Sequence, residues 1–128
     1  MKKFNLLLIC FILSCVGALA QAVITFDTKE HDFGDIDEDA GLATYVFKFK
    51  NEGNEALLLT RVQASCGCTT PDWTKTPVEP GHTGEIKISY NPKGRPGNFL
   101  KSITVMSNAE TDREVLLIKG NVTRAAAN

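Results

Sequence analysis

Apolar and polar residues alternate with a period of two along most of the chain beyond residue 22. Ile86, Ile88 and Tyr90, for example, alternate with charged or hydroxyl-bearing residues. This alternation is typical of β-strands that bury one face. An unbroken apolar run, which includes Leu57, Leu58 and Leu59, is instead expected to be buried on both faces. The pattern predicts strands over residues 23–26, 43–50, 56–62, 86–90, 99–105 and 115–122.

Turn signals separate these segments. The stretches 51–54 and 91–97 are rich in Asn, Gly and Pro, which favour turns or cannot continue a hydrogen-bonded ladder. Beyond the N-terminal leader, no window repeats apolar residues at helical spacing over three turns, so no long helix is expected. Roughly seven short strands with turn signals every ~8–12 residues predict an immunoglobulin-like β-sandwich.

The first residues have the three regions of a secretory signal peptide. Lys2 and Lys3 precede an apolar run, and the A-x-A patterns ending at Ala20 and Ala22 offer two cleavage positions. The apolar run is shorter than the ~20 residues of a membrane span. Residues 1–20 are therefore predicted to be a cleaved leader, with lipid attachment at Cys15 as the alternative. An exported protein of the periplasm, the outer-membrane surface or the medium is expected.

The length and charge of the chain limit the number of domains and the kinds of partner that are expected. The chain has 128 residues and a net charge of −1, and no cluster of Lys or Arg follows the first three residues. A domain usually takes ~100–200 residues, so we expect one domain over residues 23–123, followed by a frayed tail at 124–128. A nucleic-acid partner is not expected, because the chain lacks a basic patch.

The segment Cys66-Gly67-Cys68 is the unusual local chemistry of the chain. In an oxidising compartment, Cys66 and Cys68 can close a small strained disulfide, because Gly67 lets the backbone bend. A strained disulfide is easily reduced, which allows a redox role. The bland interpretation is that both cysteines simply pack as small apolar residues.

A metal site is a further interpretation of the same cysteines. Two thiolates suit Cu(I) or Zn²⁺, but a structural zinc site usually has four ligands. His31 and His82 would have to complete the set, and both are predicted to lie in loops. No cofactor other than copper or zinc is expected here.

The motifs of nucleophilic and metal-dependent hydrolases and of phosphate binding are missing from the sequence. No catalytic residues are therefore assigned, and a non-enzymatic module that binds a protein or glycan of the cell envelope is the favoured interpretation. Unpaired backbone groups on edge strands could accept a strand from a partner.

Several short motifs, taken in order, resemble a bacterial family known as domain of unknown function 1573. The resemblance covers about residues 24–122, and its Cys-Gly-Cys piece is the most specific. It implies an exported, immunoglobulin-like sandwich related to modules of ciliary and centrosomal proteins and of pilus chaperones, but no established function. The matching segments are 31–34, 47–53, 65–69, 80–84, 90–92 and 119–120.

Overall fold

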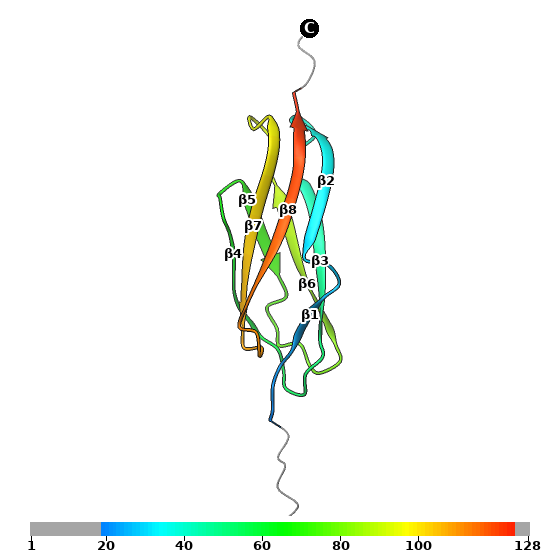
Figure 1. The fold of residues 1–128 in the computed structure, drawn as a ribbon, viewed down its shortest axis with the longest axis vertical. Coiled ribbons are helices and arrows are strands. Elements are labelled where there is room, and N and C mark those ends of the chain that lie inside the picture. The colour runs from blue at the N-terminus through cyan, green and yellow to red at the C-terminus, as the bar shows by residue number, and fades with distance from the viewer. Residues whose placement is uncertain (1–18, 125–128) are drawn as a thin grey trace, which may run out of the picture.

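Eight strands form two four-stranded sheets that pack face to face, in a computed structural model that describes residues 19–124 (Figure 1). The strand order is β1-β3-β6-β5 in the first sheet and β2-β8-β7-β4 in the second. The predicted immunoglobulin-like sandwich is confirmed. The strands are β1 (Ile24–Phe26), β2 (Glu30–Asp37), β3 (Ala43–Asn51), β4 (Leu59–Ala64), β5 (Thr69–Trp73), β6 (Thr83–Tyr90), β7 (Gly97–Ser107) and β8 (Arg113–Thr123).

The core lies between the sheets and is built from the alternating residues of their long strands. Phe47, Phe49 and Ile88 of the first sheet face Ile103 and Leu116 of the second, and all five side chains are at most 1% exposed. Burial of such a side chain contributes roughly 1.5–3 kcal/mol each. The period-two pattern therefore identifies most of the side chains that hold the sheets together.

One buried polar side chain ties together the end of the sandwich where β3 stops. Asn51 is 0% exposed. Its amide NH₂ donates to the carbonyls of Glu55 (2.7 Å) and Val78 (2.9 Å). Its amide oxygen accepts from the N–H groups of Gly53 (2.9 Å) and Val23 (3.3 Å). This residue was expected only as part of a turn, but it joins four backbone positions.

The strand prediction was wrong at three places. The segment around His31 was expected to be a loop but forms β2, which pairs in parallel with β8. Strand β5 was also missed, because Pro71 argues against a strand and β5 is an edge strand that tolerates it. The run before β4 is not buried on both faces, since Leu57 is 0% exposed but Leu58 is 38% exposed.

The N-terminal leader and its cysteines, Cys10 and Cys15, lie outside the described residues, as does the tail beyond Arg124. The described chain already joins the fold at Gln21 and Ala22, which bond to Asn54 and Glu110. Within residues 19–124, no helix has the length and apolar character needed to cross a membrane. Strand β1 begins at one end of the sandwich and strand β8 ends at the opposite end (Figure 1).

Candidate functional site

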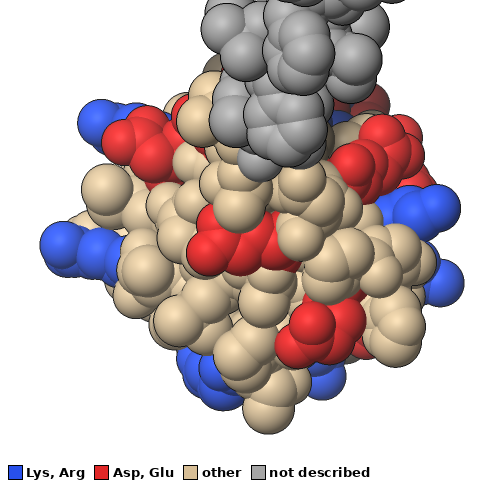
Figure 2. All heavy atoms as spheres, turned by 90° about the horizontal axis from the view of Figure 1, so that it is seen from below, with Lys and Arg blue, Asp and Glu red and all other residues tan. Residues whose placement is uncertain are grey.

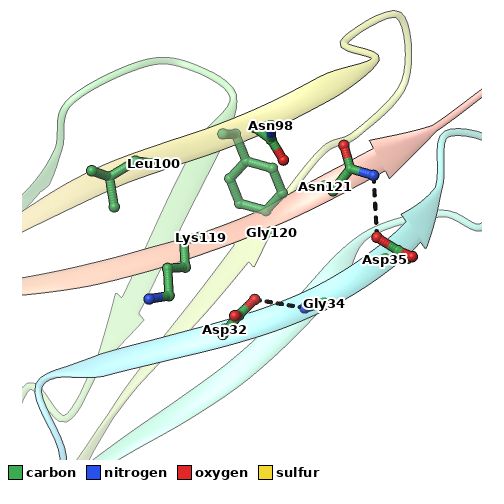
Figure 3. A pocket seen from close by; sticks show the side chains of 9 residues that line it. Asp32, Gly34, Asp35, Asn98, Leu100, Lys119, Gly120 and Asn121 are labelled. Atoms are coloured by element: carbon green, nitrogen blue, oxygen red, sulfur yellow. Dashed lines mark hydrogen bonds between the residues drawn. The ribbon is translucent and has the colours of Figure 1, made fainter.

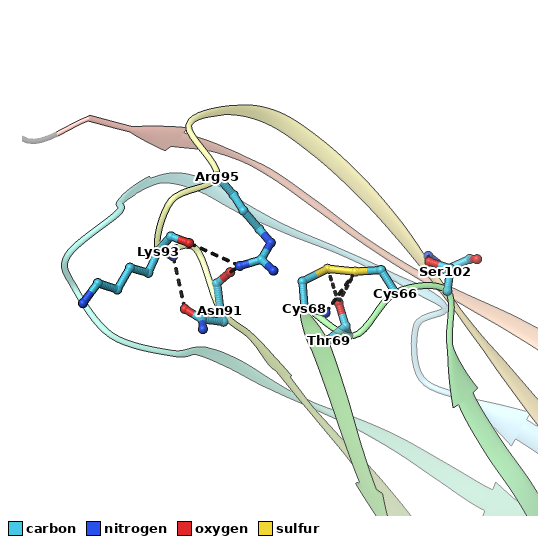
Figure 4. Close-up of a disulfide and its surroundings, with 8 residues drawn as sticks. Cys66, Cys68, Thr69, Asn91, Lys93, Arg95 and Ser102 are labelled. Atoms are coloured by element: carbon cyan, nitrogen blue, oxygen red, sulfur yellow. Dashed lines mark hydrogen bonds between the residues drawn. A yellow bond between two sulfur atoms is a disulfide. The ribbon is translucent and has the colours of Figure 1, made fainter.

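The Cys66–Cys68 turn connects β4 to β5, where the chain crosses from one sheet to the other. Cys66 and Cys68 form a disulfide, with their Cα atoms 5.3 Å apart. Figure 4 shows this bond between the ends of the two strands. The turn lies at the end of the sandwich opposite Asn51, because Thr69 pairs with Tyr90 whereas Asn51 bonds to His82, at the other end of β6.

Backbone hydrogen bonds hold the turn on both sides of the disulfide. Before it, the Ser65 N–H donates to the Ser102 carbonyl (2.9 Å), and the Ser65 hydroxyl accepts from the Ser102 N–H (3.2 Å). After it, the Asn91 N–H donates to the Cys68 carbonyl (2.9 Å). The position of the turn therefore does not depend on the S–S bond alone.

The two sulfur atoms have different surroundings. Cys66 is half-buried, whereas Cys68 is 6% exposed and belongs to the core. The N–H of Cys68 donates to Sγ of Cys66 at 3.2 Å. The Thr69 hydroxyl lies 4.0 Å from Sγ of Cys66 and 3.6 Å from Sγ of Cys68. Solvent can thus reach one sulfur more easily than the other.

A cation lies close to the turn on the loop between β6 and β7. The Arg95 guanidinium donates to the carbonyls of Asn91 (3.4 Å) and Lys93 (3.2 Å), and Figure 4 shows it turned toward the disulfide. Burial raises the pKa of Tyr90, and the charge of Arg95 partly offsets this increase. The Tyr90 ring stacks on Phe99 at a centroid distance of 4.0 Å. A positive charge and a buried phenol thus border the turn.

The predicted metal ligands are not brought together. His31 stacks on Tyr45 of the other sheet at a centroid distance of 3.7 Å. His82 lies in the loop before β6, as predicted, and Cys68 neighbours the far end of that strand, ~25 Å away at ~3.3 Å per residue. No group of three or more His, Cys, Asp or Glu residues is positioned to hold a metal within residues 19–124. Cys66, Cys68, His31 and His82 therefore do not form one site.

A second candidate site, the outer surface of β7 and β8, was not foreseen from the sequence. Leu100, Met106 and Val115 are 62%, 37% and 43% exposed, and Leu117 is half-buried beside them. All four occupy the outward-facing rows of β7 and β8. We call these four residues the β7–β8 face. The apolar run at residues 115–118 was the available signal, but sequence alone cannot tell a solvent-facing Val115 from a buried one.

A hollow of about 470 Å³ opens at the β2 side of this face (Figure 3). It arises where the register of β2 against β8 shifts between Asp32 and Asp35, around Gly34 with a φ of 67°. Gly120 lets the Phe99 ring pack against the backbone at this edge of the hollow, because a Cβ would come within 2.8 Å of that ring. The lining residues are Asp32, Gly34, Asp35, Asn98, Phe99, Leu100, Lys119, Gly120 and Asn121.

Charged groups surround the β7–β8 face unevenly. Asp32 and Asp35 lie on the β2 side, with Asp35 accepting a hydrogen bond from the Asn121 amide (3.1 Å). Lys119 is bonded to Glu30 at 2.7 Å, and this carboxylate raises the Lys119 pKa. Arg61 and Arg113 line a smaller hollow of about 210 Å³ on the β4 side. On the end of the molecule seen in Figure 2, acidic and basic residues are instead interspersed.

The family model described as "Protein of unknown function (DUF1573)" matches residues 24–122. The chain belongs to the DUF1573 family. This match confirms the resemblance, and it includes the Cys66–Cys68 turn and both strands of the β7–β8 face. A search of curated proteins found no match to this DUF1573 member.

Three solved structures share the fold of this DUF1573 member. A protein of unknown function from Porphyromonas gingivalis W83 is 16% identical, with a TM-score of 0.71 over 85% of this chain and 51% of that one. The ASH/PapD-like domain 7 of human CEP192 is 9% identical, with a TM-score of 0.68 over 90% and 95% of the two chains. The YadV chaperone is 13% identical, with a TM-score of 0.57 over 82% and 54%.

These likenesses show the fold. The chain spans about half the length of the P. gingivalis protein. The family is one of unknown function, and these likenesses give this member an immunoglobulin-like, PapD-like fold.

Proposed function

We propose that this DUF1573 member is an exported, non-enzymatic binding module of the bacterial cell envelope, and that its β7–β8 face binds a partner protein. The observation that carries the proposal is the exposure of Leu100, Met106 and Val115 on one sheet face. Apolar side chains gathered at a surface favour association, because their burial removes apolar area from water. The signal-like leader at residues 1–20 supports export.

The outer face of the other sheet provides the contrast. Its outward rows on β3 and β6 carry mainly hydroxyl and charged side chains, and Val46 is the half-buried exception. A charged face of this kind suits contact with water. The two sheets therefore differ in what they present to solvent, and the difference favours the β7–β8 face as the interface. The charged and hydroxyl residues are Thr44, Lys48, Lys50, Glu85, Lys87 and Ser89.

The charges around the face define the chemistry of the partner. Asp32 and Asp35 border the large hollow, and Arg61 and Arg113 border the smaller one on the opposite side. A complementary protein surface has an apolar centre, a Lys or Arg side chain for the large hollow and a carboxylate for the arginines. Such complementarity steers encounter and fixes the orientation of the bound partner.

The placement of the cysteines and histidines supports a non-enzymatic role. Both thiols are joined in the disulfide, so neither is a free nucleophile in this state. His31 is stacked on Tyr45 in the other sheet, and His82 lies at the far end of β6 from Cys68. Neither histidine is positioned as a base for Cys66 or Cys68.

Site-specific photocrosslinking in the native envelope tests the proposal. A photoreactive residue in place of Leu100 is expected to yield one discrete protein adduct, and Val115→Asp is expected to abolish it. The matched control carries Val46→Asp, the same substitution on the outward row of β3, and should keep the adduct. A crosslink to a second copy, to a glycan or to nothing would overturn the assignment of a partner protein, as would loss of the adduct in both variants.

A further inference from the structure

The Cys66–Cys68 disulfide contributes little as a structural staple. A disulfide stabilises a fold mainly by restricting the unfolded chain, and the effect is smallest for the shortest loops. This bond links residues separated by only two positions, and the bonds of Ser65 with Ser102 and of Asn91 with Cys68 hold the turn on both sides. The fold is therefore expected to survive when the disulfide opens. The bond can then be broken and formed again without unfolding of the protein.

The surroundings of the sulfurs give the two cysteines different roles. Cys66 is the more exposed of the two residues, so an incoming thiol is expected to reach its sulfur first. A thiolate on Cys66 would be stabilised by the N–H of Cys68 at 3.2 Å. A thiolate on the buried Cys68 would have the Thr69 hydroxyl at 3.6 Å as a hydrogen-bond donor.

Strand β7 also offers a partner an unpaired edge beside the disulfide. Strand β4 pairs with β7 from Ser107 to Ile103, whereas β7 continues back to Gly97. Among the described residues, no strand pairs with residues 97–101 of β7 on the side of β4. An extended segment that pairs along this edge would bring its side chains next to the turn.

From this geometry we infer that the Cys66–Cys68 turn is a thiol–disulfide exchange site for a protein thiol, with Cys66 as the attacked sulfur and Cys68 as the resolving one. A partner thiolate attacks Sγ of Cys66 and forms a mixed disulfide. The Cys66–Cys68 bond breaks with its electron pair on Cys68, and that thiolate takes a proton from water. This activity is distinct from binding at the β7–β8 face.

The mixed disulfide has two outcomes. The Cys68 thiol can return its proton to water and attack Cys66 as a thiolate, which releases the partner as its original thiolate. Alternatively, a second thiolate of the partner attacks the partner's sulfur in the mixed disulfide, and Cys66 leaves as a thiolate. In that case the partner dithiol loses two electrons and two protons to form a disulfide, and the Cys66–Cys68 pair gains them. Each disulfide therefore oxidises one dithiol.

The roles are tested by trapping the mixed disulfide in the folded wild-type protein. The oxidised protein is mixed with reduced glutathione as the probe thiol and quenched with acid, and mass spectrometric fragmentation locates the adduct. Because the site is read directly, Cys10 and Cys15 do not confuse the result. Glutathione is expected on Cys66 in about tenfold or greater excess over Cys68. Equal labelling, an excess on Cys68, or labelling only after denaturation would overturn the assignment.

Variants that keep one cysteine of the turn provide the matched kinetic test, in a background in which Cys10 and Cys15 are both replaced by Ser. Cys68→Ser keeps Cys66, and its reaction with oxidised glutathione should be about tenfold or more faster than that of Cys66→Ser, which keeps the buried Cys68. Far-UV circular dichroism checks that both variants are folded. Cu(I) bound by the reduced protein tightly enough to prevent the glutathione adduct would refute exchange and favour a metal site. Val115→Asp should leave the exchange rate unchanged, which separates this inference from the proposed partner interface.

Discussion

The two ends of the sandwich are closed in opposite ways. At one end, Asn51 is fully buried and connects four backbone groups through its amide. At the other end, a covalent bond joins Cys66 to Cys68, although hydrogen bonds of Ser65, Asn91 and Thr69 already hold the same turn. Removing the Asn51 side chain should therefore destabilise the fold more than breaking the disulfide.

This difference shows that the strength of a bond and its contribution to folding are separate quantities. The amide of Asn51 is fully buried and satisfies backbone groups at buried and part-buried positions, so removing it takes a hydrogen-bond partner from each of them. The disulfide restricts only a very short segment of the unfolded chain, which has little conformational entropy to lose. Breaking the disulfide therefore lowers the free energy of unfolding only slightly. The disulfide end is for this reason the one that can change its chemistry while the fold persists.

The largest effect is expected for Asn51→Ala. The Glu55 carbonyl and the N–H groups of Gly53 and Val23 lose this partner together, whereas the Val78 carbonyl keeps the Leu57 N–H at 2.9 Å. The free energy of unfolding should fall by about 3–5 kcal/mol, because each stranded group costs about 1 kcal/mol or more. Urea unfolding followed by tryptophan fluorescence measures the change, with Trp73 as the probe.

Asn108→Ala is the matched control for that measurement. The Asn108 amide also makes two backbone bonds, with Leu58 (2.8 Å) and Ala56 (3.0 Å), but the residue is exposed. Water can replace the lost bonds, so the expected loss is about 1 kcal/mol or less. Equal losses in the two variants would show that burial of Asn51 does not decide its contribution.

A smaller effect is expected from the start of the chain, which belongs to the Asn51 end. Ala22 is 1% exposed, its carbonyl accepts from the Glu110 N–H (2.9 Å), and Gln21 exchanges hydrogen bonds with Asn54. A chain that begins at Val23 should therefore be about 1–3 kcal/mol less stable than one that begins at Gln21.

The same contacts favour one of the two cleavage positions that the sequence offers. We expect the exported protein to begin at Gln21, because cleavage after residue 20 keeps these bonds. N-terminal sequencing of protein recovered from the envelope checks this outcome. A first residue of Val23, or a lipid on Cys15, would contradict it.

A still smaller effect is expected for Cys66→Ser combined with Cys68→Ser. Chain entropy for so short a loop corresponds to about 1.5 kcal/mol at most. The urea midpoint of the double variant should therefore lie much closer to the wild type than that of Asn51→Ala. A loss as large as that of Asn51→Ala would make the disulfide a true structural bond and remove the contrast between the two ends.

The strands that alternate regularly could be predicted from the sequence, because one face of each is buried between the sheets. Strand β2 could not, because it is an edge strand of acidic residues around Gly34 and gains its order by pairing with β8. Strand β5 was missed for a similar reason, since an edge tolerates Pro71. Local patterns do not report strands that depend on a distant neighbour.

The candidate sites divide in the same way. The Cys66–Cys68 turn could be identified because its two cysteines are close in sequence. The hollow beside Gly34 and Gly120 could not, because it depends on a register shift between β2 and β8. The β7–β8 face was hidden as well, since an exposed Val115 and a buried Leu116 have the same apolar character in the sequence.

The smallest effect concerns Tyr90, which pairs with Thr69 at the disulfide end. Burial raises its pKa above the ordinary 10.0, so the folded state holds the phenol proton more tightly than the unfolded state does. This stabilisation is fully present below pH 10 and is lost as the pH rises through the raised pKa. Urea midpoints between about pH 8 and 11 should therefore fall more steeply in the Cys66→Ser/Cys68→Ser background than with Tyr90→Phe added to it. Because Arg95 lowers the Tyr90 pKa, adding Arg95→Gln to the same background should enlarge the fall of the urea midpoint at high pH. Identical pH profiles for the background, the Tyr90→Phe protein and the Arg95→Gln protein would mean that neither burial nor Arg95 acts on Tyr90. The chemistry at this end of the sandwich would then be confined to the sulfurs.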